Sequence, residues 1–302
     1  MKITIAGANG FLGRYLCDYF AQRSYDLTLL VRNRFVSPYK QLLWNPATGE
    51  IDQGAIDGQD VVINLAGKNI AAERWNDKVK SEIIESRVSA TELIGKTIAA
   101  AKIKPSLLLN ASAVGVYGHR DAAETITEQS PPGSGFMADS CLHCEAAAQI
   151  AVSAGIRVVK LRIGVVLAKE GGALARMLPF FRLGLGGKIG SGNQMMSWIA
   201  LEEIGPIIEH IIKTPGINGP VNLTAPTPVS NAEFTRGLGK ALHRPAFLPV
   251  PGFALKLAFG EMAEEALLGG ANVLPQKLLD SGYQFRYKEL QPTLAAIFGQ
   301  TI

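Results

Sequence analysis

The sequence predicts an α/β fold, in which a doubly wound parallel sheet is followed by a small C-terminal α+β lobe. Up to residue 166, apolar segments typical of buried strands alternate with segments of helical periodicity, as expected for parallel strands joined by helices. Beyond residue 166, closely spaced glycines and prolines replace this alternation. We therefore predict one domain over residues 1–166, which regains a strand or helix from residues around 195–225, and a substrate lobe over 167–302.

The first 31 residues have the pattern of a strand, a helix and a second strand. Residues 2–6 and 26–31 are apolar, and apolar side chains recur at helical spacing between Phe11 and Phe20. Glycines let the chain turn sharply and approach a pyrophosphate at the helix N-terminus, so this turn predicts a dinucleotide site, although ordinary strand-to-helix turns also contain such triplets. The turn consists of Gly7, Ala8, Asn9, Gly10, Phe11, Leu12 and Gly13.

Arg32 directly follows the second predicted strand. A site that prefers NAD usually has an acidic residue there to bind the ribose 2′-hydroxyl, whereas a guanidinium suits a 2′-phosphate. The alternative is a solvated arginine in a basic stretch with Arg34 and Lys40. Because no acid stands at this strand end, we predict NADP(H) in preference to NAD(H).

The next segments add a loop over residues 38–58, a strand over 61–65 and a helix over 73–101. The strand ends in small residues at Ala66 and Gly67, which lets the backbone approach the adenosine side of a nucleotide. Arg87 falls on the apolar stripe of the helix, where an unpaired charge is costly. Its partner is either a nearby carboxylate, Glu82 or Glu85, or a cofactor phosphate.

Ser112 follows a predicted strand over residues 106–111, ahead of a predicted helix over 136–154 and a strand over 157–163. The carboxyl ends of parallel strands carry the site in such sheets, so its hydroxyl can bind a substrate carbonyl or alcohol. Serine is also a common turn or cap residue. In the C-terminal lobe, five glycines between residues 184 and 192 form either a substrate-covering loop or a plain surface loop, in which Lys188 either meets an anionic group or is solvated.

Composition limits the partners. The 302 residues carry a net charge of +4 without basic runs, so we expect a small-molecule substrate and no nucleic acid. The N-terminus does not resemble a signal peptide and no apolar stretch reaches membrane-spanning length, which predicts a cytoplasmic protein without membrane contact. The three cysteines read as free thiols, and the histidines lack metal-ligand spacing, so no metal is expected. We allow for a homodimer.

With these residues in place, the chain resembles the extended short-chain dehydrogenase/reductases, and within them the atypical YfcH-like epimerase-family branch. The matching stretches cover nearly the whole chain and include residues 7–13, 64–67, 74–75, 86–87, 112–118, 161–167, 181–192, 198–199, 222–223, 244–245, 260–261 and 275–285. The resemblance implies a Rossmann domain that binds NADP(H), with a small lobe over the active-site cleft. It also implies cofactor contacts from Val31, Arg32, Leu65, Ala66, Glu82 and Arg87.

One departure from this superfamily concerns its Tyr-x-x-x-Lys pair, in which the lysine lowers the pKa of the tyrosine that exchanges a proton with substrate. If Glu145 matches the glutamate that follows this motif, Met137 and Cys141 occupy the tyrosine and lysine positions. The branch's Trp-Ile-His segment likewise ends in Ala200. We retain Ser112 and Tyr117 as catalytic candidates, and Asp139 and Cys141 as other acids. Two functions stay open: an oxidoreductase or epimerase with non-standard acid–base residues, and a non-enzymatic NADP(H)-responsive protein.

Overall fold

The computed structural model describes residues 1–299, which divide into two compact units. The first unit contains residues 1–112, 140–161 and 208–221. The second contains residues 113–139, 162–207 and 222–299. Each unit is thus assembled from three stretches of chain.

The first unit is built on a mostly parallel sheet of eight strands. β5 (Val61–Asn64) pairs in parallel with β1 (Lys2–Ala6) and β6 (Leu107–Ala113), and β2 (Asp26–Val31) pairs in parallel with β1. The full order is β12-β8-β6-β5-β1-β2-β3-β4, with β12 (Gly219–Leu223), β8 (Arg157–Ile163), β3 (Lys40–Asn45) and β4 (Glu50–Ile51) as the other strands. This sheet confirms the predicted Rossmann-type α/β class.

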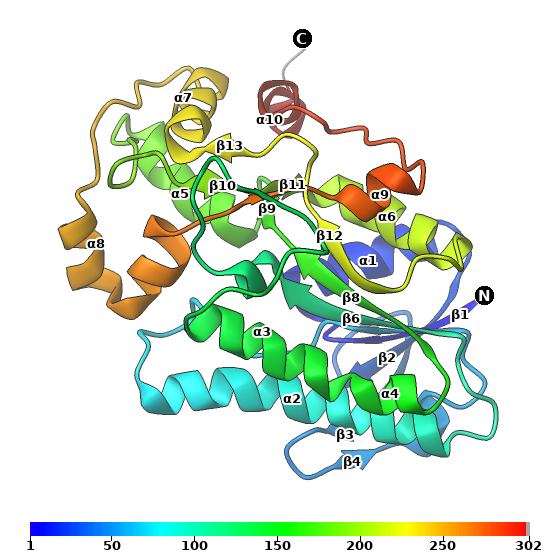
Figure 1. The fold of residues 1–302 in the computed structure, drawn as a ribbon. Coiled ribbons are helices and arrows are strands. Elements are labelled where there is room, and N and C mark those ends of the chain that lie inside the picture. The colour runs from blue at the N-terminus through cyan, green and yellow to red at the C-terminus, as the bar shows by residue number, and fades with distance from the viewer. Residues whose placement is uncertain (300–302) are drawn as a thin grey trace. The chain divides into compact units, whose positions relative to one another are not determined.

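Helices cover both faces of this sheet. Figure 1 shows α2 (Asp77–Ala100) and α4 (Gln149–Ser153) side by side on one face, with α1 (Phe11–Ala21) on the other. Alternate residues of the strands point to opposite faces, so Ala6, Val62 and Leu108 meet the buried stripe of α2. The sheet and this stripe together form the hydrophobic core that fixes the carboxyl ends of β1, β5 and β6.

Two strands occupy the segment where the sequence predicts a loop over residues 38–58. β3 pairs in parallel with β2, and β4 pairs antiparallel with β3 at the edge of the sheet. Between β4 and β5 lies a 3-10 helix, η1 (Gln53–Ala55). The loop prediction is wrong here because β3 is mostly exposed or half-buried and lacks the continuous apolar pattern of the central strands.

The second unit combines short strand pairs with helices and thereby has the expected α+β character. β9 (Val165–Leu167) pairs with β11 (Trp198–Ala200), β10 (Met195–Met196) with β13 (Val229–Ser230), and β14 (Asn272–Val273) with β7 (Thr125–Ile126). Its helices are η2 (Val114–Tyr117), α5 (Gly172–Arg182), α7 (Asn231–Ala241), α8 (Gly252–Phe259), the π-helix η3 (Ala263–Leu268), α9 (Gln276–Asp280) and α10 (Leu290–Phe298). Trp198 and Phe234 are fully buried in its core.

Two further helices, α3 (Phe136–Ala147) and α6 (Leu201–Lys213), each contribute residues to both units. α3 carries the positions at which the superfamily places its tyrosine and lysine. Within residues 1–299, no helix is both long enough and apolar enough to cross a membrane.

Candidate functional site

The glycine-rich turn between β1 and α1 tolerates no side chain at two of its positions. Gly7 has a φ of +80°, and a Cβ built on it would lie 2.8 Å from the carbonyl carbon and oxygen of Leu65. A Cβ on Gly13 would lie 2.2 Å from the carbonyl oxygen of Gly7 and 2.6 Å from the Cα of Ala8. These approaches are far inside van der Waals contact, so both positions require glycine.

The N-terminus of α1 has no side-chain cap. Gly10 is the N-cap residue, no side chain accepts a hydrogen bond from the first turn, and that turn contains no acidic residue. The first N–H groups of a helix have no partner within the helix and carry the positive end of its dipole. An uncapped, glycine-lined helix start of this kind suits an anion such as a pyrophosphate.

A buried polar network holds the loop that follows β5. Asn64 is 2% exposed, and its Oδ1 accepts a hydrogen bond of 3.1 Å from the backbone N–H of Ala66. Its Nδ2 donates to Oδ1 of Asn110 at 2.7 Å and to Oγ1 of Thr91 at 3.1 Å. The network fixes the Leu65–Ala66 backbone against which Gly7 packs. The sequence shows only polar residues within apolar elements and does not indicate that they meet.

Arg87 on α2 is partly buried and lies against this loop. A Cβ on Gly67 would come within 3.1 Å of its Cγ, and its Nη1 donates to the carbonyl oxygen of Ile83 at 2.9 Å. Burial lowers the pKa of the guanidinium. Among residues 1–299, no carboxylate pairs with Arg87, so the structure contains a desolvated cation beside the glycine loop.

The two carboxylates that the sequence offers as partners of Arg87 are engaged elsewhere. Glu82 binds Lys68, with 2.5 Å between Oε2 and Nζ, and this contact lowers the pKa of Glu82. Glu85 accepts a hydrogen bond of 2.6 Å from Ser81. The intramolecular salt bridge considered for Arg87 is therefore not formed in the part of the chain described.

The two predicted cofactor-binding residues at the end of β2 differ in their exposure to solvent. Val31 is buried in the sheet, whereas Arg32 directly after it is exposed to solvent. Arg34, two residues further on, donates from Nη1 to the carbonyl oxygen of Gln41 at 3.2 Å. Arg32 is thus available to a ligand at this strand end, while Arg34 helps to order the segment that leads to β3.

Ser112 near the end of β6 belongs to a chain of polar side chains within the first unit. Its Oγ donates a hydrogen bond of 2.8 Å to Oε1 of Glu145 on α3. The other oxygen of Glu145, Oε2, lies 3.8 Å from Nζ of Lys160 on β8. Glu145 is only 4% exposed. Nothing in the sequence indicates that Glu145 meets Ser112, because the two residues are 33 positions apart in the chain.

Tyr117 is fully buried inside the second unit. Its Oη donates to Oδ1 of Asn222 and accepts from Nη1 of Arg162, both at 2.8 Å. Burial is the main cause that raises the pKa of its hydroxyl. A phenol held in this way favours a structural role over proton exchange with substrate.

We expect Tyr117→Phe to lower the free energy of unfolding by about 1–3 kcal/mol, because Arg162 and Asn222 would each lose a buried partner. Urea unfolding followed by circular dichroism measures the change. Tyr39→Phe is the matched control, since the Tyr39 hydroxyl has no hydrogen-bond partner among residues 1–299. Wild-type stability of Tyr117→Phe would contradict the structural role.

The first two turns of α3 contain neither a phenol nor an amine at the superfamily positions. Met137 packs beside Gly115, where a Cβ would meet its Cε at 3.1 Å, and Cys141 is buried. Asp139 on the same helix is exposed. The backbone N–H of Met137 donates to Oε2 of Glu265 at 3.2 Å.

The remaining candidates of the second unit take part in local structure. Nζ of Lys188 donates to the carbonyl oxygen of Ser191 at 3.2 Å, within its own glycine-rich loop. Ala200 is buried in β11. No group of three or more histidine, cysteine, aspartate or glutamate side chains within residues 1–299 is arranged to hold a metal ion.

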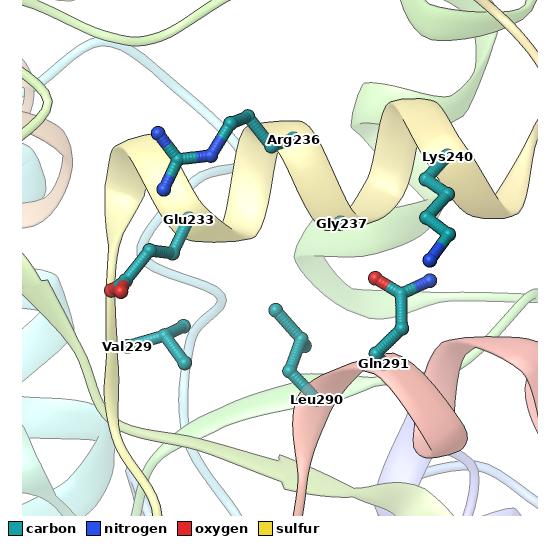
Figure 2. Close-up of a pocket in the computed structure, with 7 residues that line it drawn as sticks. All are labelled: Val229, Glu233, Arg236, Gly237, Lys240, Leu290 and Gln291. Atoms are coloured by element: carbon teal, nitrogen blue, oxygen red, sulfur yellow. The ribbon is translucent and has the colours of Figure 1, made fainter.

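A hollow of about 290 Å³ lies between α7 and α10, near β13. Figure 2 shows Arg236 and Lys240 along α7 and Gln291 on α10 at its edge. It is wide open to solvent, and none of its seven lining residues belongs to the predicted cofactor or catalytic set. The lining residues are Val229, Glu233, Arg236, Gly237, Lys240, Leu290 and Gln291.

Comparison with known proteins finds relatives from one family, the epimerase family, that match nearly the whole chain. The human epimerase family protein SDR39U1 is 35% identical over 300 residues, which cover 98% of this chain and 99% of the human protein. The Mycobacterium tuberculosis epimerase family protein MT2273 is 42% identical over 293 residues, covering 97% of this chain and 96% of that protein. Residues 250–297 also match a domain of unknown function, DUF1731.

Solved structures agree with these relatives. The crystal structure of human SDR39U1 with NADPH matches with a TM-score of 0.90 and 34% identity, and the match covers all of both chains. A nucleoside-diphosphate sugar epimerase from Corynebacterium glutamicum matches with a TM-score of 0.81 and 31% identity over 99% of this chain and 58% of that one. A family model covers residues 3–222, and on this evidence of sequence and fold the chain belongs to the NAD dependent epimerase/dehydratase family.

Proposed function

We propose that this protein binds NADP(H) and acts as an oxidoreductase or epimerase on a carbonyl compound or a sugar-nucleotide-like substrate. The observation that carries the proposal is that Arg87, a partly buried cation, has no carboxylate partner among the described residues. Arg87 lies beside Gly67, in the same unit as the uncapped N-terminus of α1. A desolvated guanidinium is costly unless an anion binds it. A dinucleotide supplies such an anion in its phosphates.

The residues present fit a dinucleotide. The absence of side chains at Gly7, Gly10 and Gly13 would let a pyrophosphate approach the N-terminus of α1 closely. The backbone of Leu65 and Ala66 could contact the nucleotide. Arg32 is the residue we assign to the ribose 2′-phosphate. The human relative that shares 34% identity was crystallised with NADPH, which supports the same ligand here. When bound, the nicotinamide gives or takes a hydride at its C4.

We expect Arg32→Glu to weaken NADPH binding roughly 10–100-fold, because a bidentate contact to a phosphate becomes a repulsion. NADH lacks this phosphate, so its affinity should change far less. Fluorescence titration with both nucleotides measures the two effects. Arg34→Glu gives the same change in charge two residues away and should affect both nucleotides weakly. Equal losses for NADPH and NADH in Arg32→Glu would refute the assignment.

The reaction itself is tested with purified protein, NADPH and NADP+, and a panel of carbonyl compounds and nucleotide sugars. We expect turnover or hydride exchange with at least one member of the panel, and loss of that turnover in Ser112→Ala, since Ser112 is the hydroxyl we place at the substrate. NADPH binding without turnover across the panel would leave no support for an enzyme.

The second candidate is a non-enzymatic protein that responds to NADP(H). Met137 and Cys141, at the positions where the superfamily has tyrosine and lysine, favour this alternative. Turnover that depends on the cofactor and disappears in Ser112→Ala would exclude it. The homodimer and the cytoplasmic location stay predictions from the sequence.

A further inference from the structure

We propose that Glu145 replaces the missing tyrosine–lysine pair by holding the substrate proton through Ser112, with Lys160 as the compensating cation. This inference rests on the proposed function. Ser112 Oγ donates to Glu145 Oε1 at 2.8 Å, and Glu145 Oε2 lies 3.8 Å from Lys160 Nζ. The three side chains come from β6, α3 and β8 and lie within one compact unit.

The direction of the first hydrogen bond defines the role of each group. Because the Ser112 hydroxyl donates its hydrogen bond to Glu145, the lone pairs of Ser112 Oγ can accept a hydrogen bond from a substrate hydroxyl. A serine hydroxyl by itself is too weak a base to keep that proton. A carboxylate behind it can take the proton, as a general base acting through one intervening hydroxyl.

Burial explains the need for Lys160. Glu145 is 4% exposed, and a carboxylate removed from water is costly unless it is hydrogen-bonded and paired. Ser112 supplies a hydrogen bond and Lys160 supplies the opposite charge. The lysine thus stabilises a carboxylate. In the superfamily motif, a lysine at position 141 would instead stabilise a phenol at position 137.

The proton balance of the oxidation is complete with these groups. The substrate O–H bond breaks and its proton passes to Ser112 Oγ, while the former Ser112 proton passes to Glu145 Oε1. A bound oxidised nicotinamide would supply the acceptor for the hydride of the adjacent C–H bond, so that the carbonyl double bond could form. Reduction reverses each transfer, with Glu145 returning the proton through Ser112. Ser112 touches the substrate, and Glu145 and Lys160 are positioning residues that act through it.

Kinetics of single and double variants test this role on the most active member of the substrate panel. We expect Glu145→Gln and Ser112→Ala each to lower kcat by about 10²–10⁴-fold, with KM and the NADPH dissociation constant within about twofold of wild type. The double variant should be no slower than the slower single variant, because both changes break one relay. Lys160→Arg should retain more of kcat than Lys160→Met.

The matched control is Glu92→Gln, which removes a carboxylate paired with Lys96 at 3.0 Å on the same unit and should leave kcat unchanged. Thermal unfolding of each variant separates loss of the relay from loss of the fold. Wild-type kcat in Glu145→Gln, or losses that multiply in the double variant, would overturn the relay while leaving the proposed function intact. Absence of turnover in the wild type would overturn both the proposed enzymatic function and the relay.

A second measurement needs no substrate. In protein labelled with 13C at the glutamate carboxyl groups, the resonance absent from Glu145→Gln is that of Glu145. We expect it to shift in Ser112→Ala and to stay in place in Ser106→Ala, whose hydroxyl bonds the carbonyl oxygen of Asp60 instead. An unmoved resonance in Ser112→Ala would show that the Ser112–Glu145 contact is not formed in solution and would overturn the proposal.

Discussion

Gly13→Ala is expected to lower the free energy of unfolding by about 2–3 kcal/mol, because its new Cβ would lie 2.2 Å from the Gly7 carbonyl oxygen and overpack the turn. The clash is with backbone, so only a displacement of α1 from β1 relieves it. The same displacement moves the helix N-terminus that we assign to the pyrophosphate. We therefore expect NADPH affinity to fall roughly 100-fold, which fluorescence titration measures alongside urea unfolding.

Gly216→Ala is the matched control for this substitution. A Cβ at Gly216 has no atom within 4 Å, and this glycine lies in a turn of the same unit. Its stability should stay within about 0.5 kcal/mol of wild type and its NADPH affinity should not change. NADPH binding of wild-type strength in Gly13→Ala would contradict the assignment of this turn to the cofactor.

Arg87→Met should weaken NADPH binding by about 1.5–3 kcal/mol, or roughly 10–150-fold, because it removes a charged hydrogen-bonding group from a phosphate. Stability should stay level or rise, since methionine retains most of the apolar stem and removes a desolvated charge that no carboxylate pairs among residues 1–299. This opposite response of binding and stability distinguishes a ligand-binding arginine from a structural one. Titration and thermal unfolding of the same samples provide both quantities.

Lys96→Met controls for the loss of a positive charge on α2. Lys96 is exposed and paired with Glu92 on the helix surface, so its removal should change NADPH affinity by less than about twofold. Equal losses of affinity in the two variants would reduce Arg87 to a general electrostatic contribution. A large loss of stability in Arg87→Met would instead identify a structural cation.

The extent to which the sequence predicted the site varies from residue to residue. Gly7 and Gly13 could be identified because the stereochemistry that demands glycine is local to the turn. The sequence offers Tyr117 as a catalytic candidate because a phenol can exchange a proton with a substrate. Its Oη contacts Asn222, 105 residues away in the chain, and no local pattern encodes such a contact. The sequence predicts a loop where β3 and β4 lie for a related reason, since pairing of β3 with β2 and of β4 with β3, rather than local periodicity, defines these strands.

The sequence by itself determined the Rossmann-type sheet, the glycine turn and the absence of a Tyr-x-x-x-Lys pair, because each depends on residues close together in the chain. Only the tertiary structure decided which charges meet. It left Arg87 without a carboxylate among the described residues, paired Glu82 with Lys68, and brought Glu145 between Ser112 and Lys160. Those contacts depend on how helices α2 and α3 pack on the sheet. The spacing of residues within one segment does not predict how distant segments pack.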